Sequence, residues 1–354
     1  MNYHITSQEY KFYPITKHIM LTVSNHVHSV HRTGIYIEKD SIDATLLASI
    51  RTDLTVEPLV NSFSTAFSSN NIFDTDDVEE EKRKFPVFSE SDTHIIVPKF
   101  WYYKQLSQEP IVVQDIVDDC DKNTLVISDD SKLFDYQEPI VNIMYDKTTK
   151  YGGGILSVPP GRGKTCMAIN LSARLGLKTL VLVHRSDFIT QWSTDILRFC
   201  PNARIGKIRQ GMIDTENKDI VIGLIQSISC RDYHPSVFAD FGLVIVDEVH
   251  NISTKQYSKA LQACCTPYTI GLSATPRRDD RMEKVFHWYL GPMLYEEKTM
   301  ISDRIVDVEI HKYTLPSNPI DKKDLKRWKY SVNFRTKQAN IAKMVTNIGE
   351  TNER

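Results

Sequence analysis

The sequence lacks the features of secreted, membrane-spanning and repeat proteins. Its six cysteines include no Cys-x-x-Cys pair, and no secretory leader is recognisable at the N-terminus. No apolar run approaches the roughly 18–20 residues of a membrane span, and no sustained internal repeat is present. We therefore expect a globular protein in a reduced, cytoplasmic setting.

The sequence also lacks an excess of charge of one sign. With 43 Lys and Arg against 45 Asp and Glu, the formal net charge is -2. There is no global basic field, so any contact with nucleic acid must use local basic surface. Of the 354 residues, 41% are hydrophobic and 25% are charged, which is typical of a globular chain of about two or three domains.

The most informative stretch is Ser157–Thr165, which reads Ser-Val-Pro-Pro-Gly-Arg-Gly-Lys-Thr. It follows an apolar run and opens a predicted helix at Lys164–Leu175, which is the arrangement of a phosphate-binding loop. Gly161 and Gly163 have no Cβ, so the backbone can turn tightly and approach an anion. Val158 replaces the first glycine of the full pattern, and an ordinary turn before a helix is the alternative interpretation.

We predict that this loop binds a nucleoside triphosphate with Mg²⁺. Lys164 is placed for the β- and γ-phosphates, and the Thr165 hydroxyl is placed for the metal ion. The loop residues predicted to bind nucleotide are Pro160, Gly161, Arg162, Gly163, Lys164 and Thr165.

Apolar runs recur from Gly152 onward, with helix-like or polar connections between them. Continuous apolar strands are typical of a parallel sheet that is buried on both faces. The predicted fold class is therefore α/β, with helices on both sides of a parallel sheet and a smaller, β-rich or mixed α/β region before it. The predicted strands are Ile155–Val158, Thr179–Val183, Asp219–Leu224, Leu243–Val246 and Thr269–Leu272.

Acidic and hydroxyl side chains follow two of these strands. Asp247 and Glu248 come directly after a strand, where open α/β sheets place their ligand chemistry. Asp247 is predicted to hold Mg²⁺, and Glu248 to orient and deprotonate the attacking water. A surface acidic pair is the alternative. The residues predicted to couple the nucleotide site to a second domain through hydrogen bonds are His250, Ser273 and Thr275.

The region before the phosphate loop is less regular. The polar segment 61–84 is predicted to be an exposed linker. The aromatic segment 97–103 is predicted to pack in a core, with base stacking as the alternative. Strands are predicted at Ile15–Val23 and Gly34–Ile37. The histidines predicted to be solvated or hydrogen-bonded, in preference to binding a metal, are His26, His28 and His31.

Three motifs, in this order and spacing, resemble those of superfamily-two helicases of the DEAD/DEAH-box type. They are Gly-x-Gly-Lys-Thr at 161–165, Asp-Glu-x-His at 247–250 and Ser-Ala-Thr at 273–275. Residues 184–192 and 271–280 are similar to the XPB-like branch, and the sequence resembles the transcript-release helicases of poxviruses and other large cytoplasmic DNA viruses, African swine fever virus among them. The resemblance covers roughly residues 130–345. It implies a RecA-like P-loop NTPase domain that uses ATP and Mg²⁺.

The resemblance also implies roles for residues outside the loop. Gln137 opens a predicted helix that runs through Tyr145, and its amide matches the family's adenine-contacting glutamine. Other polar residues match motifs that contact the nucleic-acid backbone, with ordinary loop polarity as the alternative. These are His184, Arg185, Gln191, Gln226 and Ser227.

The expected function is that of an ATP-dependent DNA helicase or translocase, viral and acting in transcription or genome processing, with RNA as the other candidate substrate and the transcription machinery as a candidate partner. We expect an accessory region at 1–125, a first motor domain at 126–304 and the start of a second at 305–354. No Gln-x-x-Gly-Arg-x-x-Arg pattern follows residue 300, although the second domain of such enzymes supplies arginines to the transition state. The alternative is a fragment that binds nucleotide and nucleic acid without efficient turnover.

Overall fold

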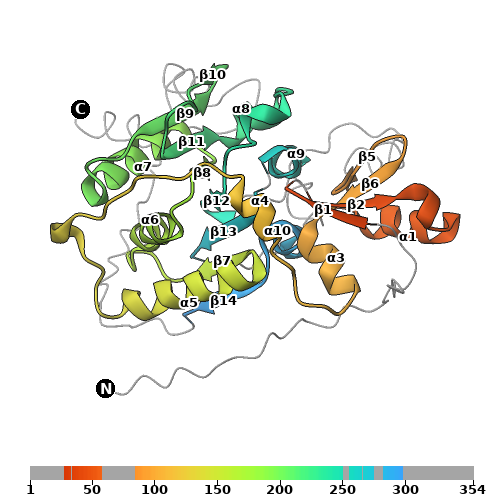
Figure 1. Ribbon diagram of the computed structural model, residues 1–354, viewed down its shortest axis with the longest axis horizontal. Helices are drawn as coiled ribbons and strands as arrows, with labels where there is room; N and C mark the ends of the chain where they lie inside the picture. The colour runs from red at the N-terminus through yellow and green to blue at the C-terminus, as the bar shows by residue number, and fades with distance from the viewer. Residues whose placement is uncertain are drawn as a thin grey trace, which may run out of the picture. The chain divides into compact units, whose positions relative to one another are not determined.

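The strands predicted around the phosphate loop lie together in one sheet. The computed structural model describes residues 28–32, 34–57, 84–249, 255–264, 266–274 and 282–297. The sheet has the order β10-β9-β11-β8-β12-β13-β7-β14 (Figure 1), and its pairs are parallel except for β9 with β10. The strands are β7 (Gly153–Ser157), β8 (Thr179–Val183), β9 (Ile205–Arg209), β10 (Met212–Ile213), β11 (Ile220–Leu224), β12 (Leu243–Val246), β13 (Tyr268–Ser273) and β14 (Met293–Glu296).

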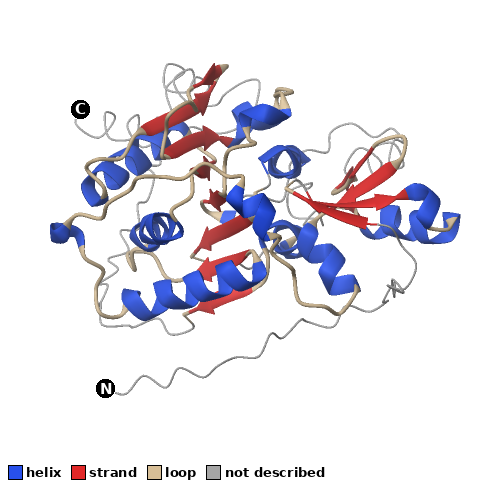
Figure 2. Cartoon of the chain, viewed as in Figure 1, coloured by secondary structure: helices blue, strands red, loops and turns tan. Residues whose placement is uncertain are grey.

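Helices cover both faces of this sheet (Figure 2). Because successive side chains of a strand point to opposite faces, Leu180 and Leu182 of β8 enter one apolar cluster, and Val181 and Val183 enter the other. One cluster includes residues of α5 (Gln137–Tyr151), α6 (Lys164–Leu175) and α7 (Ser186–Phe199). The other includes residues of α8 (Ile225–Ser229), α9 (Lys255–Cys264) and α10 (Glu283–Leu290). The prediction of a parallel sheet buried on both faces is confirmed.

The region before the phosphate loop forms a separate antiparallel sheet, in the order β1-β2-β6-β5. A second pair, β3 with β4, is also antiparallel. This agrees with the predicted mixed α/β character of the N-terminal region. Its elements are β1 (His28–His31), β2 (Gly34–Glu38), η1 (Lys39–Ser41), α1 (Ala44–Asp53), β3 (Thr55–Val56), β4 (Phe85–Pro86), β5 (Ser89–Glu90), β6 (His94–Val97), α3 (Lys99–Gln105), α4 (Gln114–Asp118) and η2 (Asp129–Ser131). A further short helix, η3 (Pro235–Val237), precedes β12.

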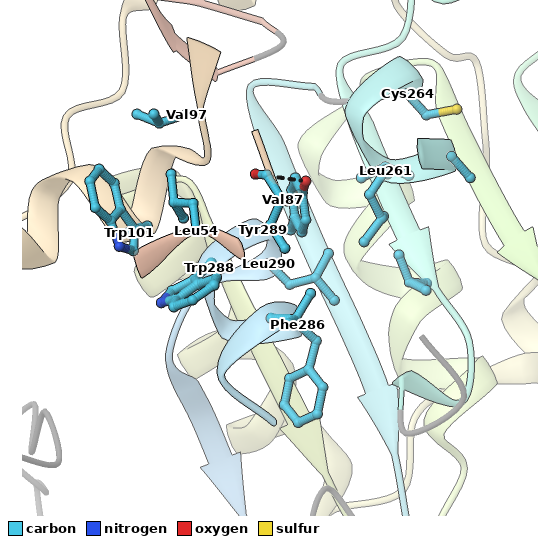
Figure 3. Close-up of a cluster of buried hydrophobic side chains, with 14 of the residues drawn as sticks. Leu54, Val87, Val97, Trp101, Leu261, Cys264, Phe286, Trp288, Tyr289 and Leu290 are labelled. Atoms are coloured by element: carbon cyan, nitrogen blue, oxygen red, sulfur yellow. Dashed lines mark hydrogen bonds between the residues drawn. The ribbon is translucent and has the colours of Figure 1, made fainter. Parts of the chain in front are cut away.

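Helix α10 links the two sheets through a shared apolar core (Figure 3). Trp288, Tyr289 and Leu290 belong to the same buried cluster as Trp101 and Leu54. The Tyr289 hydroxyl donates a hydrogen bond of 3.3 Å to the backbone oxygen of Val87. The aromatic segment 97–103 was predicted to pack in a core, and its side chains Phe100 to Tyr103 are buried.

Several predictions fall partly or wholly outside the described residues. These are the strand at Ile15–Val23, nearly all of the linker at 61–84, His26 and everything after residue 297. His28 and His31 lie on β1, and the His31 ring shares a 2.8 Å hydrogen bond with the Ser29 hydroxyl. Among the described residues, no helix is long and apolar enough to cross a membrane.

Candidate nucleotide site

The predicted motifs gather at one edge of the larger, mostly parallel sheet. Parallel strands that lie side by side end at the same edge, and the register pairs Ser157 with Ser273 and Val246 with Leu182. The phosphate loop follows β7, and the acidic pair follows β12. The motif beginning at His184 follows β8, and Gln226 follows β11. Strand order therefore brings residues from distant parts of the chain to a common edge, where ligands bind in open α/β folds.

The loop between β7 and α6 has the backbone of an anion-binding turn. Gly161 and Gly163 have φ values of +80° and +81°, a region that other residues rarely adopt. Gly163 is the N-cap residue of α6, and an added Cβ there would lie 2.3 Å from Nε2 of Gln137. The Val158 backbone N–H donates to the Ser273 oxygen at 3.2 Å, which ties the loop to β13. The predicted helix at Lys164–Leu175 is confirmed, and it ends at a left-handed C-cap, Gly176.

The amide of Gln137 is engaged by the loop and its surroundings. Its Nε2 donates to the backbone oxygen of Arg162 at 3.0 Å and to the Tyr136 hydroxyl at 3.2 Å. Its Oε1 accepts from the Phe134 backbone N–H at 3.0 Å, with the Cys166 thiol 4.0 Å away. The side chain is 2% exposed. The structure thus gives Gln137 the role of bracing the loop, and the predicted adenine contact stays a prediction.

Arg162 is fixed by an ion pair that was not predicted from the sequence. Its guanidinium donates to the Glu297 carboxylate at 3.1 and 2.9 Å and lies 4.0 Å from the ring centre of Tyr136. Glu297 follows β14, a short strand paired with β7, and its backbone N–H donates to the Ser157 oxygen. The predicted strands omitted β14, so no local pattern indicated that this carboxylate lies beside the loop.

The catalytic candidates lie within reach of each other. Lys164 Nζ is 4.0 Å from Oε1 of Glu248. Glu248 has φ of +53°, which is uncommon and strained for a residue with a side chain. Thr165 follows Lys164 in the first turn of α6 and is half-buried. The predicted lysine and carboxylate are thus close together. The backbone strain falls on Glu248, which is predicted to orient the attacking water.

Asp247 is held by the indole of Trp192. The Trp192 Nε1–H donates to Oδ2 of Asp247 at 2.8 Å, and the Asp247 backbone N–H donates to the Leu182 oxygen at 3.0 Å. Burial raises the pKa of Asp247 above its ordinary value, and the neighbouring charge of Glu248 adds to this, while Trp192 and Lys164 act in the opposite direction. Trp192 was within a motif noticed in the sequence, but no role was predicted for it.

The predicted coupling residues are described only in part. Ser273 ends β13 with its side chain fully buried, and its backbone oxygen accepts from Val158 in the phosphate loop. His250 and Thr275 lie outside the described residues. The structure therefore connects Ser273 to the nucleotide loop through the backbone.

Three of the residues predicted to contact nucleic acid, Arg185, Gln191 and Gln226, are exposed. Arg185 precedes α7 and forms an exposed ion pair with Asp187 at 2.6 Å. His184 is half-buried, with its ring centre 4.9 Å from that of Phe188.

Ser227 differs from these residues because it is buried. Its hydroxyl accepts a 3.1 Å hydrogen bond from the Gln210 backbone N–H, and its backbone oxygen accepts from the Tyr233 hydroxyl. In this structure Ser227 stabilises the turn between β9 and β10.

The comparisons with known proteins agree with this geometry. Residues 130–278 match the family described as type III restriction enzyme, res subunit. Relatives and a solved structure similar to this chain carry helicase names. The predicted resemblance is confirmed, and so is the RecA-like fold: the UvsW helicase of bacteriophage T4 aligns with a TM-score of 0.51 at 16% identity, over 77% of this chain and 100% of that one.

Relatives with a helicase or translocase name include viral and archaeal proteins. A putative ATP-dependent RNA helicase of Acanthamoeba polyphaga mimivirus is 28% identical over 320 residues, which are 90% of this chain and 57% of that protein. The DNA 3'-5' translocase XPB2 of Sulfurisphaera tokodaii is 33% identical over 49% of this chain and 37% of that protein. A putative ATP-dependent RNA helicase of African swine fever virus is 30% identical over 45% of this chain and 32% of that protein. The chain thus spans 57% of the first of these relatives and less than half of the other two.

Proposed function

We propose that this chain contains the first motor domain of an ATP-dependent DNA helicase or translocase of viral type, which hydrolyses ATP when nucleic acid binds and acts in transcription or genome processing. The observation that supports this most directly is the position of Lys164, 4.0 Å from Glu248 and at the same sheet edge as Asp247. A lysine of a phosphate loop beside a carboxylate pair is the arrangement that phosphoryl transfer to water requires.

Each residue of the site has a task in this scheme. Backbone N–H groups of the loop and the N-terminus of α6 bind the phosphates, and Lys164 neutralises charge on the β- and γ-phosphates. Glu248 accepts a proton from the attacking water and orients it. Arg162 is braced by Glu297 and Gln137 is bonded to the Arg162 backbone, so the loop is ordered before nucleotide binds.

The donor set of the site fits Mg²⁺. Thr165 contributes a hydroxyl oxygen and Asp247 a carboxylate oxygen, and Mg²⁺ prefers oxygen ligands of this kind together with substrate phosphates. Trp192 occupies Oδ2 of Asp247 with a neutral donor, so that bond adds no positive charge beside the ion. When bound, Mg²⁺ would neutralise negative charge that develops on the phosphate oxygens.

Nucleic acid binds, in this proposal, through its backbone at the edge that carries the exposed Arg185, Gln191 and Gln226. Contacts of this type fix position without reading sequence, and their affinity falls as salt rises. We favour DNA, the substrate in the name of the archaeal relative. We assign residues 1–125 to an accessory region, 126–304 to the first motor domain and 305–354 to the start of a second.

The test is steady-state ATP hydrolysis by the chain with and without single-stranded DNA or RNA. We expect stimulation by DNA, and we expect Lys164→Ala to abolish it. Lys150→Ala is a matched control, because Lys150 is an exposed lysine of α5 paired with Glu109. Unchanged stimulated hydrolysis in Lys164→Ala would overturn the assignment of the loop. Nucleotide binding with no stimulated hydrolysis would instead favour the binding-only alternative.

A further inference from the structure

Helix α7 presents two different surfaces to its surroundings. Its buried side carries Ile189, Trp192 and Ile196, spaced three and four residues apart, and packs on the sheet. Gln191 is exposed beside Trp192, and Arg185 is exposed just before the helix begins. One rigid element therefore joins the edge predicted to contact nucleic acid to the interior of the nucleotide site.

The Trp192 indole is well suited to hold a carboxylate that must bind a cation. Its side chain is 1% exposed, and its Nε1–H donates to Asp247 Oδ2 at 2.8 Å. An indole N–H is a donor only and carries no charge. It can therefore fix the carboxylate without competing with a positive ion, which a lysine or arginine in its place would do.

The backbone of Asp247 is fixed by the same neighbouring strand. Its N–H donates to the Leu182 oxygen of β8, and β8 leads through His184 directly into α7. A shift of α7 against the sheet would therefore move the indole relative to a carboxylate whose backbone stays in place. A ligand that binds the exposed side of α7 and shifts the helix would therefore change the hydrogen bond between Trp192 and Asp247.

We propose that Trp192 is a positioning residue: it orients the Asp247 carboxylate for the metal ion and transmits nucleic-acid binding on α7 to the nucleotide site. The proposal rests on the proposed function, because it assumes that Asp247 contacts Mg²⁺. A partner that orients a metal ligand through a hydrogen bond typically changes metal affinity about 10–100-fold when it is removed. A bond that only packs α7 on the sheet would not affect the dependence on Mg²⁺.

The variant Trp192→Phe keeps an aromatic ring in the buried position, and it removes the indole N–H together with part of the indole's volume. Trp101→Phe is its matched control, because Trp101 is also fully buried and its indole donates to the carboxylate of Asp53. Both residues are far from the phosphate loop in sequence and lie outside the larger sheet. Both variants lose one indole–carboxylate bond and a similar volume. Any difference in nucleotide binding between the two variants therefore reflects the place of the Trp192–Asp247 bond at the nucleotide site.

The experiment measures binding of ADP to the whole chain by calorimetry at a series of Mg²⁺ concentrations. For Trp192→Phe we expect the Mg²⁺ concentration at half-saturation to rise about 10–100-fold, and saturating Mg²⁺ to restore ADP affinity to within about twofold of the wild type. Trp101→Phe should show the wild-type Mg²⁺ dependence. The same Mg²⁺ dependence of ADP binding in the wild type and both variants would overturn the role of Trp192. An equal loss of ADP affinity in Trp192→Phe and Trp101→Phe would overturn it as well.

A second readout is intrinsic fluorescence, which needs no turnover. The chain has four tryptophans, so the difference between the wild-type and Trp192→Phe spectra reports on Trp192. We expect this difference to change when single-stranded DNA is added and when Mg²⁺ and ADP are added. A difference spectrum that responds to neither would overturn the proposal. If the wild type binds no Mg²⁺ and ADP at all, the proposed function fails first, which is a distinguishable result.

Discussion

The guanidinium of Arg162 and the carboxylate of Glu297 form a two-bond pair, with N···O distances of 3.1 and 2.9 Å. The pair joins the middle of the phosphate loop to the end of β14, and the side chains of Arg162 and Glu297 are 29% and 12% exposed. Two parallel bonds fix the plane of a guanidinium as well as its position. The loop is therefore braced from the sheet edge before any phosphate binds.

Substitution of Glu297 by glutamine should weaken nucleotide binding about fivefold. A neutral amide cannot accept both guanidinium bonds, and a partly exposed ion pair of this kind contributes about 1 kcal/mol. Because the pair does not touch the transferring phosphate, turnover at saturating ATP should stay near the wild-type value. A titration with a fluorescent ADP analogue and a steady-state assay together separate these two effects.

Glu138→Gln is the control for this change. It removes the same charge from another Arg–Glu pair, in which Arg174 Nη2 lies 2.6 Å from Glu138 Oε1 between α6 and α5. This pair does not include a loop residue. Equal losses of nucleotide affinity in both variants would show that Glu297 has no particular effect on the loop.

Gln137→Glu should reduce affinity for ATP and GTP by the same factor. The carboxylate cannot donate to the Arg162 backbone oxygen, which lies 3.0 Å from Nε2 in the wild type, and the two oxygens would repel each other. We expect a loss of about tenfold for both nucleotides, measured by direct binding. Loss confined to ATP would show that Gln137 reads the adenine base, as the family resemblance implies.

The left-handed backbone of Glu248 predicts a difference between two substitutions that both remove its charge. Asn tolerates φ of +53° better than Gln does. Glu248→Asn should therefore be more stable than Glu248→Gln, by about 1 kcal/mol. Both variants should lose hydrolysis by about 10²–10⁴-fold. Thermal unfolding of the two proteins side by side measures the first effect, and a higher midpoint for the Gln variant would contradict the strain argument.

Local features around the phosphate loop were predictable because they depend on neighbouring residues. The glycines of the loop, the helix at Lys164–Leu175 and the cap at Gly176 are set by the conformational range of glycine and by helix geometry. The apolar runs that became β8, β11 and β12 are buried on both faces, so their composition marked them clearly. The strand β9 was not predicted, because alternate residues of this strand are exposed.

Partnerships across the sheet could not be predicted in the same way. Trp192 and Asp247 are 55 residues apart, and Arg162 and Glu297 are 135 residues apart. Their contacts follow from β12 lying beside β8 and β14 beside β7, which no local pattern specifies. The residues of the site were therefore predictable from motifs, whereas the groups that hold them in position required the strand order.

Asp219 should make the free energy of unfolding depend on pH in the acid range. Its fully buried carboxylate accepts hydrogen bonds from the Arg204 guanidinium and backbone and from the Thr124 backbone and hydroxyl. Burial alone would raise the pKa of Asp219, but these donors outweigh it and hold the pKa well below its ordinary value. A lowered folded-state pKa stabilises the fold above the unfolded-state pKa of about 3.9, and this contribution is lost as pH falls below it.

Asp219→Asn should therefore lower the free energy of unfolding by about 3 kcal/mol at pH 7, because it leaves buried donors without a charged acceptor. The difference in free energy of unfolding between Asp219→Asn and the wild type should become smaller as pH is lowered from about 5 to 3. Urea unfolding at each pH measures this difference. Asp214→Asn is the control, since Asp214 forms a half-exposed pair with Lys218 at 3.3 Å and should change stability by less than about 1 kcal/mol. If the difference in free energy of unfolding between Asp219→Asn and the wild type stays constant across this pH range, the charge of the carboxylate does not stabilise the fold.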